Sequence, residues 1–135
     1  MTSFRMKALL LFFCAGLIAL TSAKMYKATV KGTTICQSKR YTGVVVILME
    51  KDRLDPDDEL AKTTSDSRGE FFITGQEDEF TTISPYIIFE HTCNAKPNCK
   101  RQTTYEIPKE KVDQEYDMSY VALDIVTAVD KEICP

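Results

Sequence analysis

Residues 43–51 read GVVVILMEK, and the unbroken apolar run from Val44 to Met49 decides the fold class. A run of this length, bounded by a glycine on one side and by charged residues on the other, is typical of a strand buried on both faces. We therefore expect residues 44–49 to form a central strand of a sheet.

The segments around this run have strand patterns of their own. Residues 24–32, KMYKATVKG, alternate Tyr26, Ala28 and Val30 with polar residues, which is the period of a half-buried strand. Ile35 falls on the opposite phase from Val30, so we expect a β-bulge at Gly32 to restore the alternation. Further strands are expected at residues 70–74, 84–93, 100–108 and 116–129.

The connections between these strands are short and polar. Residues 66–69, DSRG, predict a turn with Gly69 at positive φ, and residues 52–62 predict an acidic loop. Residues 109–115, KEKVDQE, fit a turn or a short helical piece. No segment has helical periodicity, so the sequence predicts an all-β domain: a two-sheet β-sandwich of about seven strands.

The first 23 residues differ from the rest. Arg5 and Lys7 precede an apolar stretch over residues 8–20, and Thr21 and Ala23 are small residues of the kind found at a cleavage site. This order predicts a secretory signal peptide over residues 1–23, with the folded domain over residues 24–135. The rival interpretation, an uncleaved membrane anchor, is weaker because the apolar stretch is shorter than a membrane span.

The charge of the remaining chain argues against one class of partner. Removing Arg5 and Lys7 takes the formal net charge from −3 to −5, and an acidic chain is a poor candidate for nucleic-acid binding. No apolar run after the leader approaches the length of a transmembrane segment. We therefore expect a secreted, extracellular protein that binds no nucleic acid.

Four cysteines remain after the leader is removed: Cys36, Cys93, Cys99 and Cys134. An even number in a small secreted domain predicts two disulfides, for which three connectivities exist. Residues 94–98, NAKPN, are turn formers, and a hairpin there would bring Cys93 and Cys99 together. By elimination, Cys36 would then pair with Cys134.

His91, the only histidine, precedes Cys93 by two residues and raises the question of a metal site or a catalytic pair. A zinc site would need a closer pair of cysteines and further ligands nearby. On a strand the two side chains point to the same side, so both can be structural. We expect no metal, cofactor or catalytic residue here, and we interpret His91 as a hydrogen-bonded strand residue beside a disulfide.

Two charged clusters are candidate binding surfaces. The acidic cluster could hold calcium, although it lacks the spacing of an EF-hand and a solvated loop is the simpler interpretation. The basic cluster could meet phosphate headgroups or an acidic receptor, although a charged edge that prevents aggregation is the simpler interpretation. The acidic cluster comprises Asp52, Asp55, Asp57, Asp58, Glu59 and Asp66, and the basic cluster comprises Lys96, Lys100, Arg101, Lys109 and Lys111.

The aromatic residues at strand spacing are expected in the core. They are Phe71, Phe72, Tyr86, Phe89 and Tyr120.

Several segments occur in an order that resembles one family. These are GVVVILMEKD, DRLDPDDELAKTTSDSRGEF, PYIIFEHTCN, CKR, YEIPKE and YDMSYVALDI. Together they resemble the transthyretin-like family of secreted nematode proteins over essentially the whole chain after the leader. The resemblance implies a prealbumin-like β-sandwich, a signal peptide and four cysteines in these places.

The resemblance also bears on function. The related hydroxyisourate hydrolases use two histidines, an arginine and a Tyr-Arg-Gly-Ser tail, whereas this chain has one histidine and ends VDKEICP. The family instead implies a non-enzymatic extracellular binding protein that engages a cell-surface protein or a lipid headgroup. A carrier of a small hydrophobic ligand is the alternative, and a hydrolase on the same fold is a further one.

Overall fold

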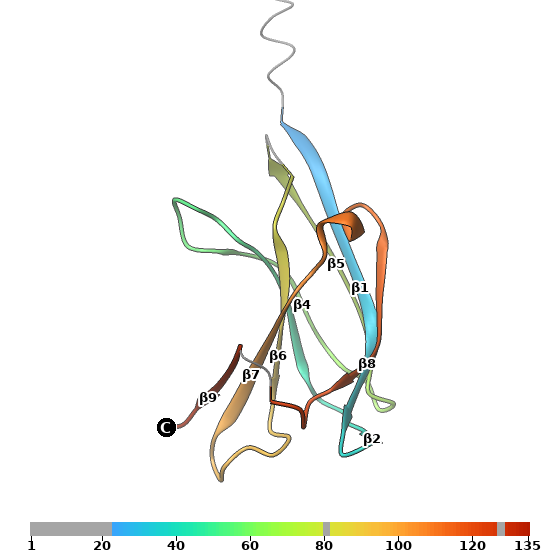
Figure 1. The fold of residues 1–135 in the computed structure, drawn as a ribbon, viewed down its shortest axis with the longest axis vertical. Coiled ribbons are helices and arrows are strands. Elements are labelled where there is room, and N and C mark those ends of the chain that lie inside the picture. The colour runs from blue at the N-terminus through green and yellow to red at the C-terminus, as the bar shows by residue number, and fades with distance from the viewer. Residues whose placement is uncertain (1–22, 80–81, 127–128) are drawn as a thin grey trace, which may run out of the picture.

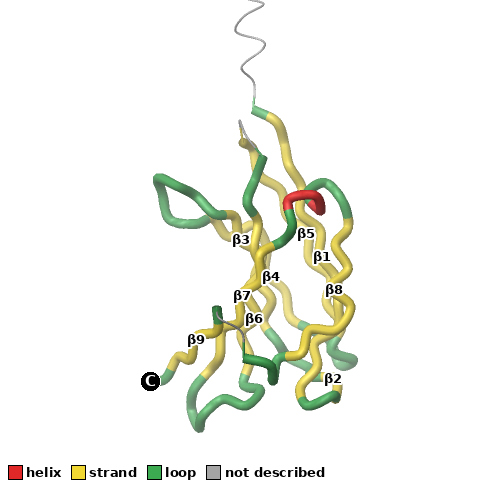
Figure 2. The backbone as a smooth tube through the Cα atoms, viewed as in Figure 1, coloured by secondary structure: helices red, strands yellow, loops and turns green. Residues whose placement is uncertain are grey.

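Two β-sheets pack face to face in the computed structural model, which describes residues 23–79, 82–126 and 129–135 (Figures 1 and 2). The expected signal peptide, residues 1–23, lies outside these ranges except for Ala23. The described strands are β1 (Lys24–Cys36), β2 (Lys39–Arg40), β3 (Val45–Glu50), β4 (Asp58–Thr64), β5 (Glu70–Glu79), β6 (Pro85–His91), β7 (Lys100–Glu106), β8 (Glu115–Ala122) and β9 (Asp130–Ile133). A single 3₁₀ turn, η1 (Lys109–Lys111), falls within the polar segment expected to be a turn or helical piece.

The first sheet is organised around β1, the longest strand. β2 and β5 pair with it in antiparallel fashion, and β8 runs parallel to it on its other edge. The second sheet has the order β4-β3-β6-β7-β9, and every pair in it is antiparallel. The predicted all-β, two-sheet class is confirmed.

Three strands were not predicted from the sequence. β2 is only two residues long, and β9 is a short, exposed strand at the edge of the second sheet. β4 lies in the second half of the segment expected to be an acidic loop. Its residues form a strand because β3 pairs along its whole length, so tertiary pairing outweighs a composition that disfavours strands.

β3 confirms the expected central strand. It lies between β4 and β6, and Val46 and Leu48 are completely buried between the sheets. On the opposite face Ile47 is only 8% exposed and Val45 and Met49 are half-buried, so the strand is nearly buried on both faces, as the apolar run predicts.

Aromatic rings fill the centre of the space between the sheets. Phe71 lies edge-to-face on Phe89, with ring centroids 5.4 Å apart, and Phe89 contacts Tyr105 in the same way at 6.0 Å. Phe72 and Tyr120, which were expected in the core, are instead 58% and 63% exposed. Phe72 follows the buried Phe71 directly on β5, so its side chain points to the outer face of the sheet. Tyr120 points outward because it follows a bulge in β8.

The expected bulge lies at Gly32, but its extra residue belongs to β8. Lys31 pairs with Asp117 and Thr33 pairs with Tyr120, so one residue of β1 faces two of β8. β1 therefore keeps a single phase: Thr34 is completely buried like Val30 before it. The expectation that β1 changes phase at Gly32 was wrong, and Cys36 consequently stays on the face that points between the sheets.

Two other local predictions have different outcomes. The turn at residues 66–69 is confirmed, with Gly69 at φ 75° and the Asp66 carboxylate accepting hydrogen bonds from the backbone N–H groups of Arg68 and Glu70. The expected strand over residues 116–129 ends early, at Ala122, where the chain leaves the sheet in a turn. Residues 127 and 128 lie outside the described ranges.

The described ranges contain no helix of the length and apolar character needed to cross a bilayer.

Candidate functional site

Both disulfides lie at one end of the sandwich, where β1 and β6 end and β7 begins. Cys36 is bonded to Cys93, and Cys99 is bonded to Cys134. The first bridge joins the two sheets, and the second ties β9 to the start of β7. The loop between Cys93 and Cys99 is therefore fixed at both ends, and we call this region the disulfide end.

The predicted pairing of Cys93 with Cys99 and of Cys36 with Cys134 was wrong. Residues 92–99 make two successive turns, closed by hydrogen bonds from the N–H of Ala95 to Thr92 O and of Cys99 to Lys96 O, rather than one tight hairpin. Cys93 continues the inward face of β6 and is 2% exposed, so it meets Cys36 from the inward face of β1. Cys99 instead lies beside the end of β9, since Lys100 pairs with Ile133.

Arg101, predicted as part of a basic binding surface, is buried. Its guanidinium is ion-paired with Asp130 and donates hydrogen bonds of 2.8 Å to the carbonyl oxygens of Cys93 and Leu123. The Arg101 side chain is 7% exposed and the Asp130 side chain 6%. Arg101 points inward because it shares its phase on β7 with Thr103, so it stabilises the disulfide end from within and contributes nothing to its surface.

His91 belongs to the same buried network. Its Nδ1 accepts a hydrogen bond from the Cys93 N–H at 3.2 Å, so its Nε2 carries the proton and donates to Thr103 Oγ1 at 3.0 Å. The Thr103 hydroxyl in turn donates to Asp130 Oδ1. Burial and the nearby Arg101 charge lower the pKa of His91 to about 4, so the ring is neutral near pH 7.

This geometry confirms the interpretation of His91 as a structural residue beside a disulfide. Both ring nitrogens have partners, the side chain is 4% exposed, and the sulfur of Cys93 is held in a disulfide. A histidine in this position has no free nitrogen to act as a base toward a substrate, and Cys93 has no thiolate.

Three exposed lysines lie at the disulfide end, and we call them the lysine patch: Lys96, Lys100 and Lys131. Lys100 lies directly opposite Ile133 in the pairing of β7 with β9, and Lys131 lies further along the same pair of strands. Lys96 is tied to β9 by a 2.9 Å hydrogen bond from its backbone N–H to Oε1 of Glu132, a residue with the opposite phase on β9 from Lys131 and Ile133. None of the ion pairs found in the described ranges involves these lysines.

Exposed aliphatic side chains accompany the lysine patch. Ile133 is 42% exposed next to Lys100. Ile125 and Val126 are 59% and 77% exposed. They closely follow Leu123, whose carbonyl oxygen accepts a hydrogen bond from the buried Arg101 guanidinium at the disulfide end. The disulfide end thus combines unpaired cations with apolar side chains on a rigid frame.

Lys109 and Lys111, the remaining members of the predicted basic cluster, lie elsewhere. Both are in η1, which Figure 1 places toward the end of the molecule away from the loop between β6 and β7. The structure therefore divides the predicted cluster into three parts: two lysines at the disulfide end, one buried arginine and two lysines on η1.

The acidic cluster is solvent-exposed, as its sequence suggested. Asp55, Asp57 and Asp58 are all exposed in and after the loop between β3 and β4. Asp57 accepts hydrogen bonds from the Tyr86 hydroxyl and from the Asp52 N–H, which lower its pKa. Burial and the Asp57 charge raise the pKa of Tyr86 to about 12.

Asp57 and Tyr86 border a groove of about 680 Å³ on the outer face of the second sheet. Apolar side chains of Ile107 and Val129 line it, and Lys51 lies at its edge. Its volume is within the range of small-molecule sites, and its lining is amphipathic. This groove was not predicted, because it joins residues from β6, β7, η1 and four connecting segments that have no common sequence pattern.

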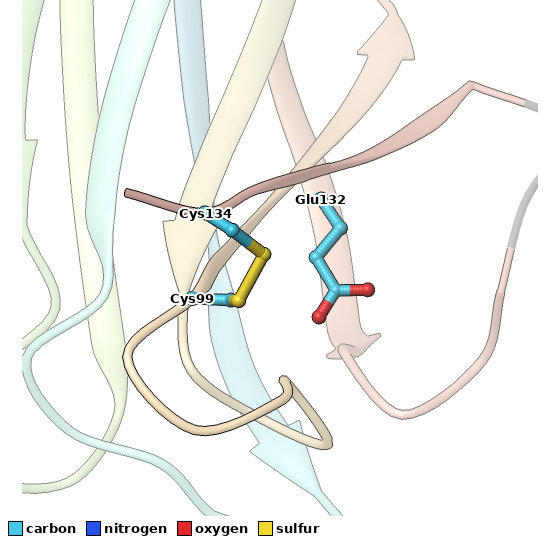
Figure 3. Close-up of side chains that lie close together, drawn as sticks. All are labelled: Cys99, Glu132 and Cys134. Atoms are coloured by element: carbon cyan, nitrogen blue, oxygen red, sulfur yellow. A yellow bond between two sulfur atoms is a disulfide. The ribbon is translucent and has the colours of Figure 1, made fainter.

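One other group of potential metal ligands lies at the disulfide end. Figure 3 shows the carboxylate of Glu132 beside the bond between Cys99 and Cys134, and these ligand atoms lie within 4.8 Å of one another. The sulfur atoms are bonded to each other, whereas metals bind the thiolate form of cysteine. In the oxidised protein this group is a disulfide rather than a metal site.

Known proteins support one family assignment. The family model described as the transthyretin-like family matches residues 31–108. Transthyretin-like protein 16 of Caenorhabditis elegans is 46% identical over 114 residues, which cover 84% of this chain and 86% of that protein. Transthyretin-like proteins 2 and 5 of the same organism are 38% and 40% identical over 89 and 90 residues, or 61% and 64% of this chain, and the matches cover 60% and 64% of their lengths.

A solved 9R-lipoxygenase structure from Cyanothece matches with a TM-score of 0.46 at 18% identity, over 74% of this chain and 16% of that one, which is too weak to support an argument. The family match covers more than half of the chain, and it agrees with the two-sheet fold and with the segments identified in the sequence. The chain therefore belongs to the transthyretin-like family.

Proposed function

We propose that the protein is a secreted, non-enzymatic binding protein whose disulfide end engages anionic phospholipid headgroups on a membrane surface. The observation that carries the proposal is the lysine patch, whose three lysines take part in none of the ion pairs of the described ranges. Lys100 and Lys131 lie beside the exposed Ile133 on the pair of β7 with β9, at an end fixed by two disulfides. Lysines attract lipid phosphates, and exposed aliphatic side chains enter the interface between headgroups and acyl chains.

The distribution of charge supports this orientation. The acidic residues of the loop between β3 and β4 lie away from the disulfide end, toward the opposite end of the molecule (Figure 1). This loop begins where Glu50, the last residue of β3, pairs with Asp58, the first residue of β4. A chain with a formal net charge of −5 after loss of its leader would be repelled by an anionic membrane as a whole. Docking through the disulfide end turns the acidic end toward solvent.

Secretion is supported by the leader pattern of residues 1–23 and by the two disulfides. We expect the secreted protein to begin within two residues of Lys24, which intact-mass measurement would show. A mature protein that retains residues 1–23 would contradict this part of the proposal.

Binding to vesicles tests the site directly. The protein should sediment with vesicles that contain phosphatidylserine but remain free with phosphatidylcholine alone. Because each lysine near an anionic surface contributes about 1 kcal/mol, Lys96→Gln/Lys100→Gln should weaken binding roughly 30-fold. Lys109→Gln/Lys111→Gln removes the same charge from η1 and serves as the matched control, with less than about a twofold effect expected.

Two outcomes would contradict the proposal. One is the absence of vesicle binding at low salt, which would favour a cell-surface protein as the partner. The other is equal weakening by both double variants, which would indicate general electrostatic attraction rather than a defined patch. Free phosphoserine should compete only weakly, because it offers the headgroup without the apolar interface.

The groove beside Tyr86 favours a second candidate function, transport of a small amphipathic ligand. Its volume of about 680 Å³ and its mixture of apolar and charged lining suit such a molecule. Native mass spectrometry of the secreted protein would reveal a bound small molecule, and Val129→Arg should release it. A protein of uniform, ligand-free mass would contradict this candidate.

A further inference from the structure

The inward face of the sandwich changes from apolar to acidic at the end opposite the disulfides. On β3 the buried positions Val46 and Leu48 are followed by Glu50. On β5 the inward positions Phe71 and Ile73 are followed by Gly75, and then by Glu77 and Glu79. Three carboxylates, those of Glu50, Glu77 and Glu79, therefore occupy inward positions that are apolar earlier in the same strands.

Glu50 is the most unusual of these residues. It is only 3% exposed. Its Oε1 accepts one long hydrogen bond, 3.5 Å, from the Ser84 N–H, and its Oε2 is buried without any hydrogen-bond partner. A buried carboxylate oxygen without a partner is costly, and such a group calls for an explanation by an unseen ligand or a proton.

Other carboxylates converge on Glu50 because β5 approaches β3 and β4 closely at Gly75. A Cβ atom on Gly75 would lie 2.8 Å from Leu60 Cβ and 3.2 Å from Leu48 Cδ2, so only glycine permits this approach. Two residues further along β5, Glu77 faces the same space, and Asp58 enters it as the register partner of Glu50.

The charges in this space are not balanced by cations within the described ranges. The ion pairs found there do not include Glu50, Asp58, Glu77 or Glu79. Lys24, the register partner of Glu79, is paired with Asp113 instead.

The pKa values respond to this crowding. Burial raises the pKa of Glu50 most, and the charges of Glu79, Glu77 and Asp52 raise it further. Burial first, and then Asp58 and the neighbouring acidic residues, raise the pKa of Glu77. The carboxylates thus lie close enough to repel one another.

We propose that Glu50, Asp58, Glu77 and Glu79 form a calcium site, with the unpartnered Oε2 of Glu50 as its innermost ligand. Calcium accepts six to eight oxygen ligands in flexible geometry, which suits long glutamate side chains, a neighbouring aspartate and water. In the structure no three of these carboxylates have their oxygens within 4.8 Å of one another. Mutual repulsion keeps them apart, and the ion draws them together by rotation of their side chains.

This site shares Asp58 with the solvated cluster that the sequence suggested, but its other ligands lie outside that cluster. Asp55 and Asp57 lie on the exposed loop, and Asp57 is engaged with Tyr86. The proposed ligands come mainly from the inward faces of β3 and β5, so they are held by the rigid part of the fold. We expect a dissociation constant of roughly 10⁻⁴–10⁻³ M, the range of extracellular calcium modules.

Calorimetric titration of the secreted, full-length mature protein with calcium chloride tests the proposal, together with thermal melts in calcium and in chelator. The wild type should bind one ion and melt several degrees higher in about 10 mM calcium, at least ten times the expected dissociation constant. Magnesium should bind at least tenfold more weakly, because its octahedral shell is demanding. Glu50→Gln should abolish the calcium response, and Glu77→Gln/Glu79→Gln should weaken it at least tenfold.

Glu106→Gln/Glu110→Gln, which removes two carboxylates outside the site, is the matched control and should bind like the wild type. Glu50→Gln should melt no lower than the wild type in chelator, since the amide replaces a buried charge. Absence of calcium binding by the wild type would overturn the proposal and leave Glu50 as a protonated acid. Unchanged binding by Glu50→Gln would overturn it as well.

Discussion

The two disulfides are expected to contribute unequally to stability, although their loops are similar in length. The bonded cysteines are separated by 57 residues in the Cys36–Cys93 bridge and by 35 in the Cys99–Cys134 bridge. In the chain-entropy model each bridge contributes about 4 kcal/mol, and the two differ by only about 0.4 kcal/mol. Loop length alone therefore predicts nearly equal losses when either bridge is removed.

The folded state distinguishes the two bridges. Cys93 is 2% exposed, and its bridge joins the two sheets beside the core. Cys134 is exposed and holds only β9, a four-residue edge strand. Because a weakly held strand can detach from the folded protein once its bridge is cut, that bridge also restricts the folded state, and its net contribution is smaller.

Cys36→Ala/Cys93→Ala should lose about 4 kcal/mol, or roughly 15 °C in Tm for a domain of this size. Cys99→Ala/Cys134→Ala should lose less than half as much. Thermal melts followed by circular dichroism measure both losses, and peptide mapping without reduction verifies the connectivity in the wild type. An equal or larger loss from the second double variant would refute the reasoning, as would a peptide linking Cys93 to Cys99.

Three further perturbations test the interior. Arg101→Ala leaves Asp130 buried and unpaired, so urea unfolding should show a loss of about 3–5 kcal/mol, and a loss below 1 kcal/mol would contradict the buried pair. The pKa of His91 is about 4 in the folded protein, against 6.5 for an unperturbed histidine. The stabilisation that the neutral ring contributes to the free energy of unfolding is therefore complete above pH 6.5 and is lost as the pH falls toward 4. Between pH 7 and pH 4 the wild type should therefore lose about 3 kcal/mol more than His91→Gln, and parallel pH profiles would contradict the neutral, buried ring. Gly75→Ala should cost about 1–3 kcal/mol in the same unfolding assay, because the added methyl group meets Leu60, and an unchanged midpoint would contradict the close approach of β5.

The sequence predicts those parts of the fold in which one strand carries its own signal. The apolar run of β3 and the alternation of Ile87, Phe89 and His91 on β6 were sufficient to place both strands in the core. The number of disulfides also follows from the even count of cysteines after residue 23, since paired cysteines are typical of small oxidised domains.

The disulfide connectivity could not be read in the same way, because it depends on which of two paired strands carries the extra residue. With the bulge on β1, Cys36 would point outward. With the bulge on β8, Cys36 shares the inward phase of Val30 and Thr34 and meets Cys93. A bulge belongs to a pair of strands, and the sequence of one strand does not assign it.

The surface charges show the same limit. Arg101 was grouped with its basic neighbours because they are close in sequence, yet its phase on β7 directs it inward. Its partner, Asp130, lies 29 residues away on an edge strand that the sequence did not predict. The buried Glu50 of β3 and the half-buried Glu77 and Glu79 of β5 were missed for a related reason, since each strand taken alone looks like an ordinary strand with an acidic end.

Hydrogen–deuterium exchange of the mature protein on phosphatidylserine vesicles tests the central claim most directly, because it locates the contact surface without altering any residue. Docking through the disulfide end should slow exchange in peptides that cover residues 94–102, 123–126 and 131–135, and leave the loop over residues 52–57 unchanged. Protection of that acidic loop, or of the groove beside Tyr86 in place of the disulfide end, would contradict the proposed membrane-binding surface.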